Sequence, residues 1–502
     1  MSMHRYGRRS LRLVGSIVGV LVVAAGGASQ ALPACVDQVV GVNERCAAWT
    51  GAYNHPGGRG GNGEDIGRAV AASPDGTKVF VTGQSRDDTT LQDQATAAFQ
   101  VGTGEILWSK RVDAAAQFDT GSAIAVDPAG TRVFVTGRSV AFEGFDWLTT
   151  AHDASTGEIL WTRRYAGPKS VDDTSFGVVT SPDGETVYVA GTADDGAGIP
   201  GDAMVEAYDA ATGERRWSAR YDGGGYDGGL RVATAADGSL VYLLGTTRRL
   251  AGNDYLVAAF EAEDEERLGE RVWAATYDGA GLGDNVAGFA LSGDGATIAV
   301  TGTSVGPQGN QDYATVAIDA LTGARRWAVR YDSTRSGNDS AAGVAITGSS
   351  VVVTGTGHEG VVCCTDYVTI AYDLATGAQR WMATENSAAR FNDTATTISA
   401  SAGQVFVSGY AVVPRGEIQP IFKIEPGTIM TASYDVATGE RRWIAHHNQS
   451  GVGSDVAVGS TMSPNGAALY VVGTFITSGV SLYPVAAAKP YAYDMGVVAY
   501  PV

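Results

Sequence analysis

The sequence predicts an all-β fold: an eight-bladed β-propeller of four-stranded antiparallel blades. One supersecondary unit returns at intervals of roughly 53 to 62 residues, which is the pattern of stacked repeats. Each interval has room for four short strands and shows no convincing helical period. Four antiparallel strands repeated eight times describe a closed propeller. A tryptophan marks each unit: Trp49, Trp108, Trp161, Trp217, Trp273, Trp327, Trp381 and Trp443.

The unit that begins at Trp161 shows how four strands fit into one repeat. Asp-Gly in its SPDG segment supplies the positive φ of a tight hairpin turn, and AATGE turns the chain back toward the next tryptophan. The strand segments themselves are rich in β-branched and aromatic residues. They are WTRRYAG (161–167), TSFGVVT (174–180), ETVYVAG (185–191) and AMVEAYD (203–209).

The two ends of the chain predict how the ring closes. Trp49 opens an outer-strand sequence, WTGAYN, with no repeat before it, and the last unit ends at GVVAYPV with no tryptophan after it. We therefore expect an N-terminal segment of about residues 46–54 to supply the outer strand of the last blade, which covers an exposed edge. Residues 32–502 would then form a single propeller domain.

Residues 1–31 read as an export signal. The first twelve residues contain four arginines, and an apolar run follows them (13–25). A stretch of small residues then ends at Ala31, where a signal peptidase could cleave. The run is too short for a stable membrane span. The mature chain is therefore expected to be secreted, periplasmic or at the cell surface. General secretory and twin-arginine export both fit, and a lipobox-like stretch leaves lipidation of Cys35 as an alternative.

The composition is strongly acidic. The chain has 35 basic and 54 acidic residues, and removing the four arginines of the signal would bring the net charge from −19 to about −23. Such a surface repels nucleic acid phosphates and anionic membranes, so neither is an expected partner.

Four cysteines remain after processing, and an even number in an exported chain suggests disulfides. The simplest assignment joins Cys35 to Cys46 and the adjacent Cys363 to Cys364. The vicinal pair could form a rigid ledge beside a ligand, bind soft metals when reduced, or only constrain its own loop.

An aspartate occupies the same place in every unit. In propeller connectivity the chain crosses there from an outer strand to the next inner strand, so all eight should face one mouth of the channel. Each carboxylate could fix its crossover turn by accepting backbone N–H bonds. Their summed field could also attract a divalent cation such as Ca²⁺. They are Asp65, Asp119, Asp173, Asp227, Asp284, Asp339, Asp393 and Asp455.

Arg231 breaks the pattern of the inner strands. It replaces the alanine or glycine found at most equivalent positions, such as Ala69 and Gly343. A cation near the axis could anchor an anionic ligand or join an internal salt bridge. The histidines show no metal-ligand spacing, and no nucleophile elbow, phosphate-binding loop or paired-cysteine zinc motif is present.

The element A-x-D-x-x-T-G-x-x-x-W, as in AYDAATGERRW ending at Trp217, resembles the tryptophan-docking motif of the quinoprotein alcohol dehydrogenase propellers. It is similarly found in non-enzymatic members of the same PQQ-like repeat superfamily, including outer-membrane assembly factors. Seven matches, one of them degenerate at Trp273, cover Ala98 to Trp443. The resemblance implies that the repeat tryptophans dock neighbouring blades.

The resemblance also implies what a quinone site would need: a vicinal disulfide, a tryptophan beneath the quinone, and Glu, Asn and Asp ligands for calcium. Cys363-Cys364 is similar to that disulfide in kind. It falls in the sixth blade, however, whereas the family's pair falls early in the chain. No match to the calcium ligands or to the catalytic aspartate can be assigned.

We therefore predict an exported PQQ-like propeller that acts as a binding or interaction scaffold rather than an enzyme. Its ligand, an unidentified protein, glycan or small molecule, would sit at the aspartate-bearing mouth with Arg231, Cys363 and Cys364. The alternative function is a dehydrogenase that depends on PQQ and calcium.

Overall fold

The computed structural model describes most of the chain from Arg45 onward. The predicted export signal (1–31), Cys35 and Cys363 lie outside the described residues. The described ranges are 45–55, 64–86, 91–114, 118–141, 144–168, 172–194, 201–249, 252–334, 337–359, 364–387, 391–401, 403–412, 427–448, 454–476 and 493–502.

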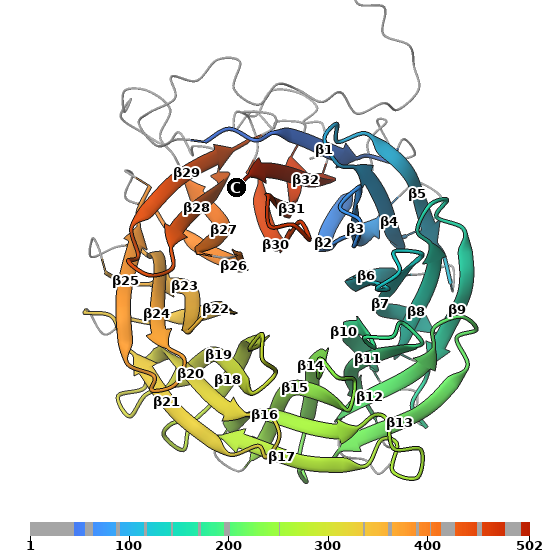
Figure 1. Cartoon of the computed structure of the whole chain (residues 1–502), viewed down its shortest axis with the longest axis horizontal. Coiled ribbons are helices and arrows are strands. Elements are labelled where there is room, and N and C mark those ends of the chain that lie inside the picture. The colour runs from blue at the N-terminus through green and yellow to red at the C-terminus, as the bar shows by residue number, and fades with distance from the viewer. Residues whose placement is uncertain are drawn as a thin grey trace, which may run out of the picture.

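The described residues form 32 strands in eight four-stranded sheets around a central axis (Figure 1). This confirms the predicted eight-bladed propeller. Within a blade the chain runs from the axis to the rim, and consecutive strands pair antiparallel, as β2, β3, β4 and β5 do. No helix among the described residues is long and apolar enough to cross a membrane.

Blades 1 to 4 each contain four consecutive strands. Their bounds are β2 (Asp65–Ala72), β3 (Lys78–Ser85), β4 (Asp93–Gln100), β5 (Ile106–Val112); β6 (Asp119–Val126), β7 (Arg132–Ala141), β8 (Gly144–Asp153), β9 (Ile159–Tyr165); β10 (Thr174–Thr180), β11 (Thr186–Ala193), β12 (Asp202–Asp209), β13 (Arg215–Tyr221); β14 (Asp227–Thr234), β15 (Leu240–Arg249), β16 (Gly252–Glu261) and β17 (Arg271–Tyr277).

Blades 5 to 7 repeat this order, and blade 8 takes its rim strand from the other end of the chain. The bounds are β18 (Asp284–Leu291), β19 (Thr297–Val305), β20 (Gln311–Asp319), β21 (Arg325–Tyr331); β22 (Ser340–Thr347), β23 (Ser350–Gly357), β24 (Asp366–Asp373), β25 (Gln379–Glu385); β26 (Thr394–Ser401), β27 (Gln404–Val412), β28 (Gly427–Asp435), β29 (Arg441–His447); β30 (Val456–Met462), β31 (Ala468–Ile476), β32 (Tyr493–Pro501) and β1 (Trp49–Tyr53).

The N-terminal strand closes the ring. β1 pairs antiparallel with β32, with Trp49 opposite Ala499 and Tyr53 opposite Met495. The eighth sheet therefore runs β1-β32-β31-β30 from rim to axis. Figure 1 shows the blue β1 beside the red β32, so the predicted closure is confirmed.

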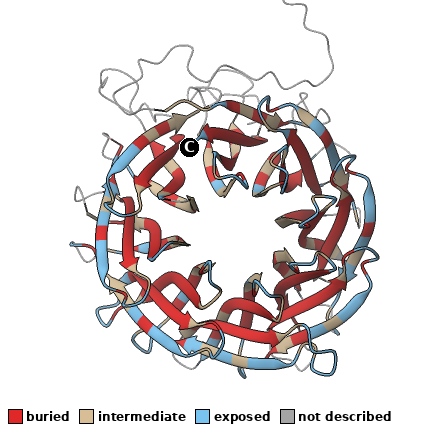
Figure 2. Ribbon diagram, viewed as in Figure 1, coloured by how far each residue is buried: buried red, intermediate tan, exposed pale blue. Residues whose placement is uncertain are grey.

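The hydrophobic core lies between the blades rather than inside them. The second and third strands are buried along nearly their whole length, because the neighbouring sheets cover both of their faces (Figure 2). The rim strands expose one face to solvent, as the alternating burial along β25 shows. The core is accordingly divided into clusters at the blade junctions.

Each repeat tryptophan before the last blade packs against the blade that follows it. Trp381 lies beside Tyr434 of blade 7, with ring centroids 6.1 Å apart, and its Nε1 donates to the Val436 carbonyl at 2.8 Å. Gly439 lies under the indole with φ 74°, and a Cβ added there would meet Trp381 Cδ2 at 2.6 Å. Only glycine suits both constraints. The same type of Nε1 bond is made by Trp108, Trp161 and Trp327.

The contribution of this hydrogen bond can be measured by comparing two tryptophans. We expect Trp381→Phe to lower the free energy of unfolding by about 2–3 kcal/mol, because it shrinks a buried ring and leaves a buried carbonyl unpaired. Trp273→Phe should cost about 1 kcal/mol less, since the Trp273 indole nitrogen has no acceptor within the described chain. Urea denaturation measures both, and equal losses would contradict the assigned role of the bond.

One carboxyl group lies wholly inside a blade junction. Glu206 of β12 is inaccessible to solvent and lies 3.8 Å from Arg215 of β13. Neither of its carboxyl oxygens accepts a hydrogen bond from any described residue. Burial therefore raises the pKa of Glu206 to about 7, although Arg215 acts in the opposite direction.

This raised pKa predicts a pH dependence of stability. Stability should fall as the pH rises from about 4.5 to about 7, because Glu206 ionises freely only in the unfolded chain. Glu206→Gln should remove this part of the profile and stabilise the protein at pH 8 by about 1–3 kcal/mol. Chemical denaturation between pH 4.5 and 8 tests the prediction, with the exposed Glu214→Gln as control. A Glu206→Gln profile that parallels the wild type would show that the burial argument is wrong.

Candidate binding site in the central channel

The eight inner strands surround a central channel, visible as the opening in Figure 1. Its described walls enclose a cavity of about 340 Å³. Most wall residues are small or apolar, because eight strands that converge on one axis leave little room for side chains. The remaining polar wall residues are hydroxyls and two arginines.

Every inner strand carries a bulge at the same place, and the bulge decides which side chain meets the channel. In β2, Gly67 pairs with Gly83 and Ala69 pairs with Thr82, so Arg68 has no residue opposite it. Such an extra residue bends the strand and redirects a side chain. Seven bulge residues line the channel: Arg68, Ser122, Phe176, Ala287, Ala342, Thr396 and Val458.

Two arginines make the channel positive. Arg68 donates from Nη2 to Gln84 Oε1 at 3.0 Å. Arg231 of β14 is surrounded by the ring walls, yet solvent in the channel still reaches it. The crowded walls lower the pKa of both guanidinium groups, and Arg138 adds repulsion at Arg68. No aspartate or glutamate is found among the described channel-lining residues.

The sequence analysis predicted Arg231 at this site and missed Arg68. Arg231 was recognisable because it replaces a small residue of the repeat. Arg68 occupies the bulge position, whose residue varies freely between blades, so its direction becomes evident only from the strand register.

The eight repeat aspartates lie at the crossovers between blades, and they are buried. All eight are essentially inaccessible to solvent, and none is among the described channel-lining residues. Burial raises the pKa of Asp65 to about 6 and also raises the pKa of Asp119 and Asp173. Their part in ligand binding stays a prediction.

Backbone amides donate hydrogen bonds to these carboxylates. Asp393 accepts from the Ser387 amide at 2.6 Å, from Ser387 Oγ at 2.7 Å and from the Val412 amide at 3.2 Å. It thereby ties the crossover segment to the end of β27. Each of the other repeat aspartates also accepts at least one backbone N–H. The arrangement supports the interpretation that these residues fix the crossover turns.

Removing one of these carboxylates should therefore destabilise the fold. We expect Asp393→Ala to lower the free energy of unfolding by about 2–4 kcal/mol, because it leaves buried donors of Ser387 and Val412 unpaired. Asp393→Asn keeps an acceptor oxygen and should cost roughly half as much. Thermal and urea denaturation give both values. An alanine variant as stable as the wild type would exclude a structural role for this residue.

At four crossovers two further aspartates approach the repeat aspartate. One lies within the first three residues of the third strand of the blade, and the other follows the fourth strand. In each set the carboxylate oxygens lie within 4.8 Å of one another. Calcium prefers such oxygen ligands. The sets are Asp93, Asp113 and Asp119; Asp202, Asp222 and Asp227; Asp254, Asp278 and Asp284; Asp312, Asp332 and Asp339.

Arginine provides counter-charge in all four sets. Arg220 lies 3.0 Å from Asp202, and Arg249 lies 3.3 Å from Asp254. Arg111 and Arg330 pair in the same way with Asp93 and Asp312. These sets are where a calcium ion would find ligands. The sequence analysis missed Asp93 and the aspartates that follow the fourth strands, which are Asp113, Asp222, Asp278 and Asp332. Calcium binding itself stays a prediction.

Only one member of the vicinal cysteine pair, Cys364, is described. Cys364 is buried just before β24 and is not among the channel-lining residues. Cys363 lies outside the described residues. The predicted disulfides and the predicted ligand role of this pair stay predictions.

The fold and the channel define a class: an eight-bladed propeller with tryptophan-docked blades around a cationic channel. The family model described as "Outer membrane protein assembly factor BamB" matches residues 92–302 and 146–472, well over half of the chain. The chain therefore belongs to this family of PQQ-like β-propeller repeats. No curated protein matches it.

Solved structures share the fold at low identity. Sqt1 of Chaetomium thermophilum, bound to the N-terminus of ribosomal protein L10, is 13% identical with a TM-score of 0.52, over 82% of this chain and 94% of that one. Quinohemoprotein alcohol dehydrogenase of Comamonas testosteroni is 14% identical with a TM-score of 0.51. The match covers 93% of this chain and 78% of that one.

The channel residues do not fit the quinone site that the dehydrogenase resemblance implies. That site combines a tryptophan beneath the quinone with Glu, Asn and Asp ligands for calcium. The described channel lining contains none of these four residue types. The part of the chain that builds the channel therefore favours a different occupant.

Proposed function

We propose that this chain is an exported, non-catalytic binding scaffold whose central channel takes up an anionic segment of a partner protein. The observation that carries the proposal is the presence of Arg68 and Arg231 in a channel whose described lining has no carboxylate, although the chain has a net charge of −19. Guanidinium groups form strong, charge-assisted hydrogen bonds with carboxylates.

The chemistry of the channel supports binding over catalysis. Its other polar side chains carry hydroxyls, and three of them have partners: Thr397 Oγ1 lies 2.9 Å from Ser460 Oγ, and Thr396 Oγ1 donates to the Ala457 carbonyl at 2.8 Å. A nucleophilic hydroxyl needs a base within hydrogen-bonding distance, and the described lining offers neither histidine nor carboxylate for that role.

The comparisons support a protein partner. The family description names an outer membrane protein assembly factor, and the similar Sqt1 propeller holds the N-terminus of another protein. By analogy this chain would capture a short segment of its partner, and the same description supports a place in the periplasm or at the outer membrane.

Export belongs to the proposal. Residues 1–31 would be removed during export, and an oxidising compartment would then allow Cys35 to pair with Cys46 and Cys363 with Cys364. No free cysteine occurs in the described part of the chain, which agrees with that compartment.

A labelled peptide tests the proposed site. We expect the mature protein to bind a fluorescein-labelled peptide of alternating Glu and Ala in a salt-dependent manner, and Arg68→Ala or Arg231→Ala to weaken binding about 5- to 20-fold. Fluorescence anisotropy measures the affinity. The matched controls are the corresponding Gln and Ala peptide and Arg163→Ala, which alters an arginine on the rim strand β9. Absent binding, or binding that neither channel variant weakens, would overturn the proposal.

Calorimetric titration with PQQ and calcium separates this function from the alternative. Stoichiometric binding that Cys363→Ala/Cys364→Ala weakens would favour the dehydrogenase. The composition of the described channel leads us to expect no saturable heat.

A further inference from the structure

The junction between blades 4 and 5 differs from the other seven. Elsewhere the described inner strands of neighbouring blades pack side by side, whereas β14 and β18 barely touch. Arg231 accounts for the opening. Blades 3 and 5 have glycine at the position of Arg231, and there the side-chain direction points at the backbone of the next blade. A Cβ added to Gly177 would lie 3.0 Å from Arg231 Cα, and a Cβ added to Gly288 would lie 2.9 Å from Gly343 Cα. A guanidinium side chain at this place holds β14 and β18 apart.

A second difference removes a ring from the same junction. Near the end of each third strand, the other seven blades have an aromatic or histidine side chain, and blade 5 has Ile318. Five of those rings lie against the repeat tryptophan of the preceding blade, with centroids 5.7 to 6.3 Å apart. The seven residues are Phe99, His152, Tyr208, Phe260, Tyr372, Tyr434 and Tyr500.

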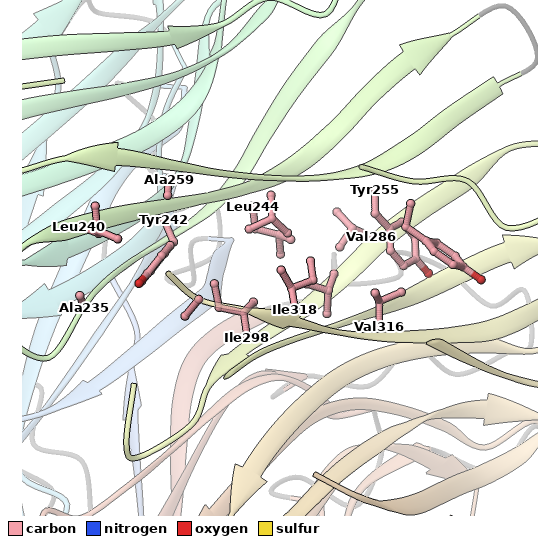
Figure 3. Packing of buried hydrophobic residues seen from close by; sticks show 14 of the residues in the cluster. Ala235, Leu240, Tyr242, Leu244, Tyr255, Ala259, Val286, Ile298, Val316 and Ile318 are labelled. Atoms are coloured by element: carbon pink, nitrogen blue, oxygen red, sulfur yellow. The ribbon is translucent and has the colours of Figure 1, made fainter. Parts of the chain in front are cut away.

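Next to Ile318, a cavity of about 310 Å³ lies between the two blades and opens to solvent on one side. Tyr255 and Val257 of β16 form one wall, and Val316 and Ile318 of β20 form the other. Figure 3 shows Tyr255 on the blade 4 side of this junction and Val316 and Ile318 on the blade 5 side. An apolar cavity of about 150 Å³ already binds benzene in another protein, so this one has room for a molecule with two rings.

The blades are also less firmly joined at this cavity. The indole nitrogen of Trp273 finds no acceptor in the described chain, whereas Trp381 bonds to the Val436 carbonyl. The outer edges of blades 4 and 5 therefore lack a hydrogen bond that fixes other junctions. A molecule entering from the rim would displace no such bond.

An arginine marks the rim end of the cavity. Arg325, the first residue of β21, lines the cavity and is exposed to solvent, as is Ala274 across from it. The structure shows no ion pair for Arg325 with any described residue. Its guanidinium group is therefore available to an anion at the mouth.

At two other junctions the arginine at this position pairs with a carboxylate, whereas Arg271 in blade 4 lies over the Tyr221 ring at 5.4 Å. Arg215 in blade 3 lies 3.8 Å from Glu206, and Arg441 in blade 7 lies 2.6 Å from Glu385 of the preceding blade. The corresponding carboxylate positions around Arg325 hold other residues. They are Val316 and Tyr277. Blade 5 therefore lacks the repeat ring, and Arg325 lacks the carboxylate partner that Arg215 and Arg441 have.

We propose that the cavity between blades 4 and 5 binds a small aromatic carboxylate. The ring of the ligand would lie against Tyr255, Val257 and Ile318. Its carboxylate would pair with Arg325, as Glu206 and Glu385 pair with the equivalent arginines. The site is separate from the central channel, so this proposal stands or falls independently of the proposed function.

The test uses the mature, full-length protein and 2-naphthoate as the probe. We expect saturable binding by calorimetry with one site. Ile318→Tyr restores the residue type of the repeat and fills the cavity, so it should weaken binding at least tenfold. It should also raise the thermal unfolding temperature, since it fills the cavity beside Trp273, and this rise shows that the variant is folded.

The charge at the mouth is tested separately. Arg325→Gln changes an exposed residue outside the core and should weaken 2-naphthoate binding about 3- to 10-fold while leaving the affinity for naphthalene-2-carboxamide unchanged. Tyr372→Ile is the matched control at the next junction, because it opens an equivalent space beside Trp327 where Gln379 replaces the arginine. That variant should gain affinity for the amide and not for the carboxylate.

Three outcomes would overturn the proposal. One is the absence of saturable binding to the wild-type protein. Another is 2-naphthoate binding that Ile318→Tyr leaves intact. The third is binding that Arg231→Ala abolishes and Ile318→Tyr does not, because this result would place the ligand in the channel.

Discussion

The packing of seven of the eight repeat tryptophans on a glycine of the next blade is the contact on which the ring depends. The glycine adopts a left-handed conformation that closes the turn between the third and fourth strands, and its missing Cβ is where the indole lies: Gly377 under Trp327 and Gly439 under Trp381. One residue type thus satisfies the turn and the junction together. The same contact recurs at seven of the eight junctions, so the outer parts of those blades are held alike. The inner strands β14 and β18 are the exception, because they lie further apart than the other neighbouring inner strands.

The repeat determined how much could be predicted from the sequence. The number of blades, the strand order and the closure by β1 followed from the tryptophan spacing and from the incomplete units at the two ends, and the structure confirms them. The crossover position of the repeat aspartates was equally evident, because a period places equivalent residues on the same part of every blade.

The candidate sites were harder to predict because they depend on register and on small volumes. Arg68 meets the channel only because a bulge redirects it, and no local pattern in the sequence marks that bulge. The sequence shows that Ile318 replaces the ring of the other repeats. Whether this replacement leaves a cavity, however, depends on how closely the sheets of blades 4 and 5 approach each other. Arg325 likewise can be recognised as a binding residue only when its neighbours are known, which are Val316 on the adjacent strand and Tyr277 on the adjacent blade.

Charge is distributed unevenly in this acidic protein. The crossover geometry, which is repeated in every blade, places many carboxylates in buried positions. There they accept hydrogen bonds from backbone amides or form ion pairs with arginines. The channel walls have the opposite sign, with Arg68 and Arg231 and no acidic side chain in the described lining. The local charge of the channel lining is therefore opposite in sign to the net charge of the chain.

The pairing of β1 with β32 joins residues about 450 positions apart in the chain, Trp49 with Ala499. Contacts between such distant residues form late, because a long loop must be closed before they contribute any stabilisation. The seven other blades can each assemble from consecutive hairpins as the chain emerges. The eighth must wait until both ends are present, so the ring remains an open arc throughout synthesis and becomes a continuous wall only in the final step of folding.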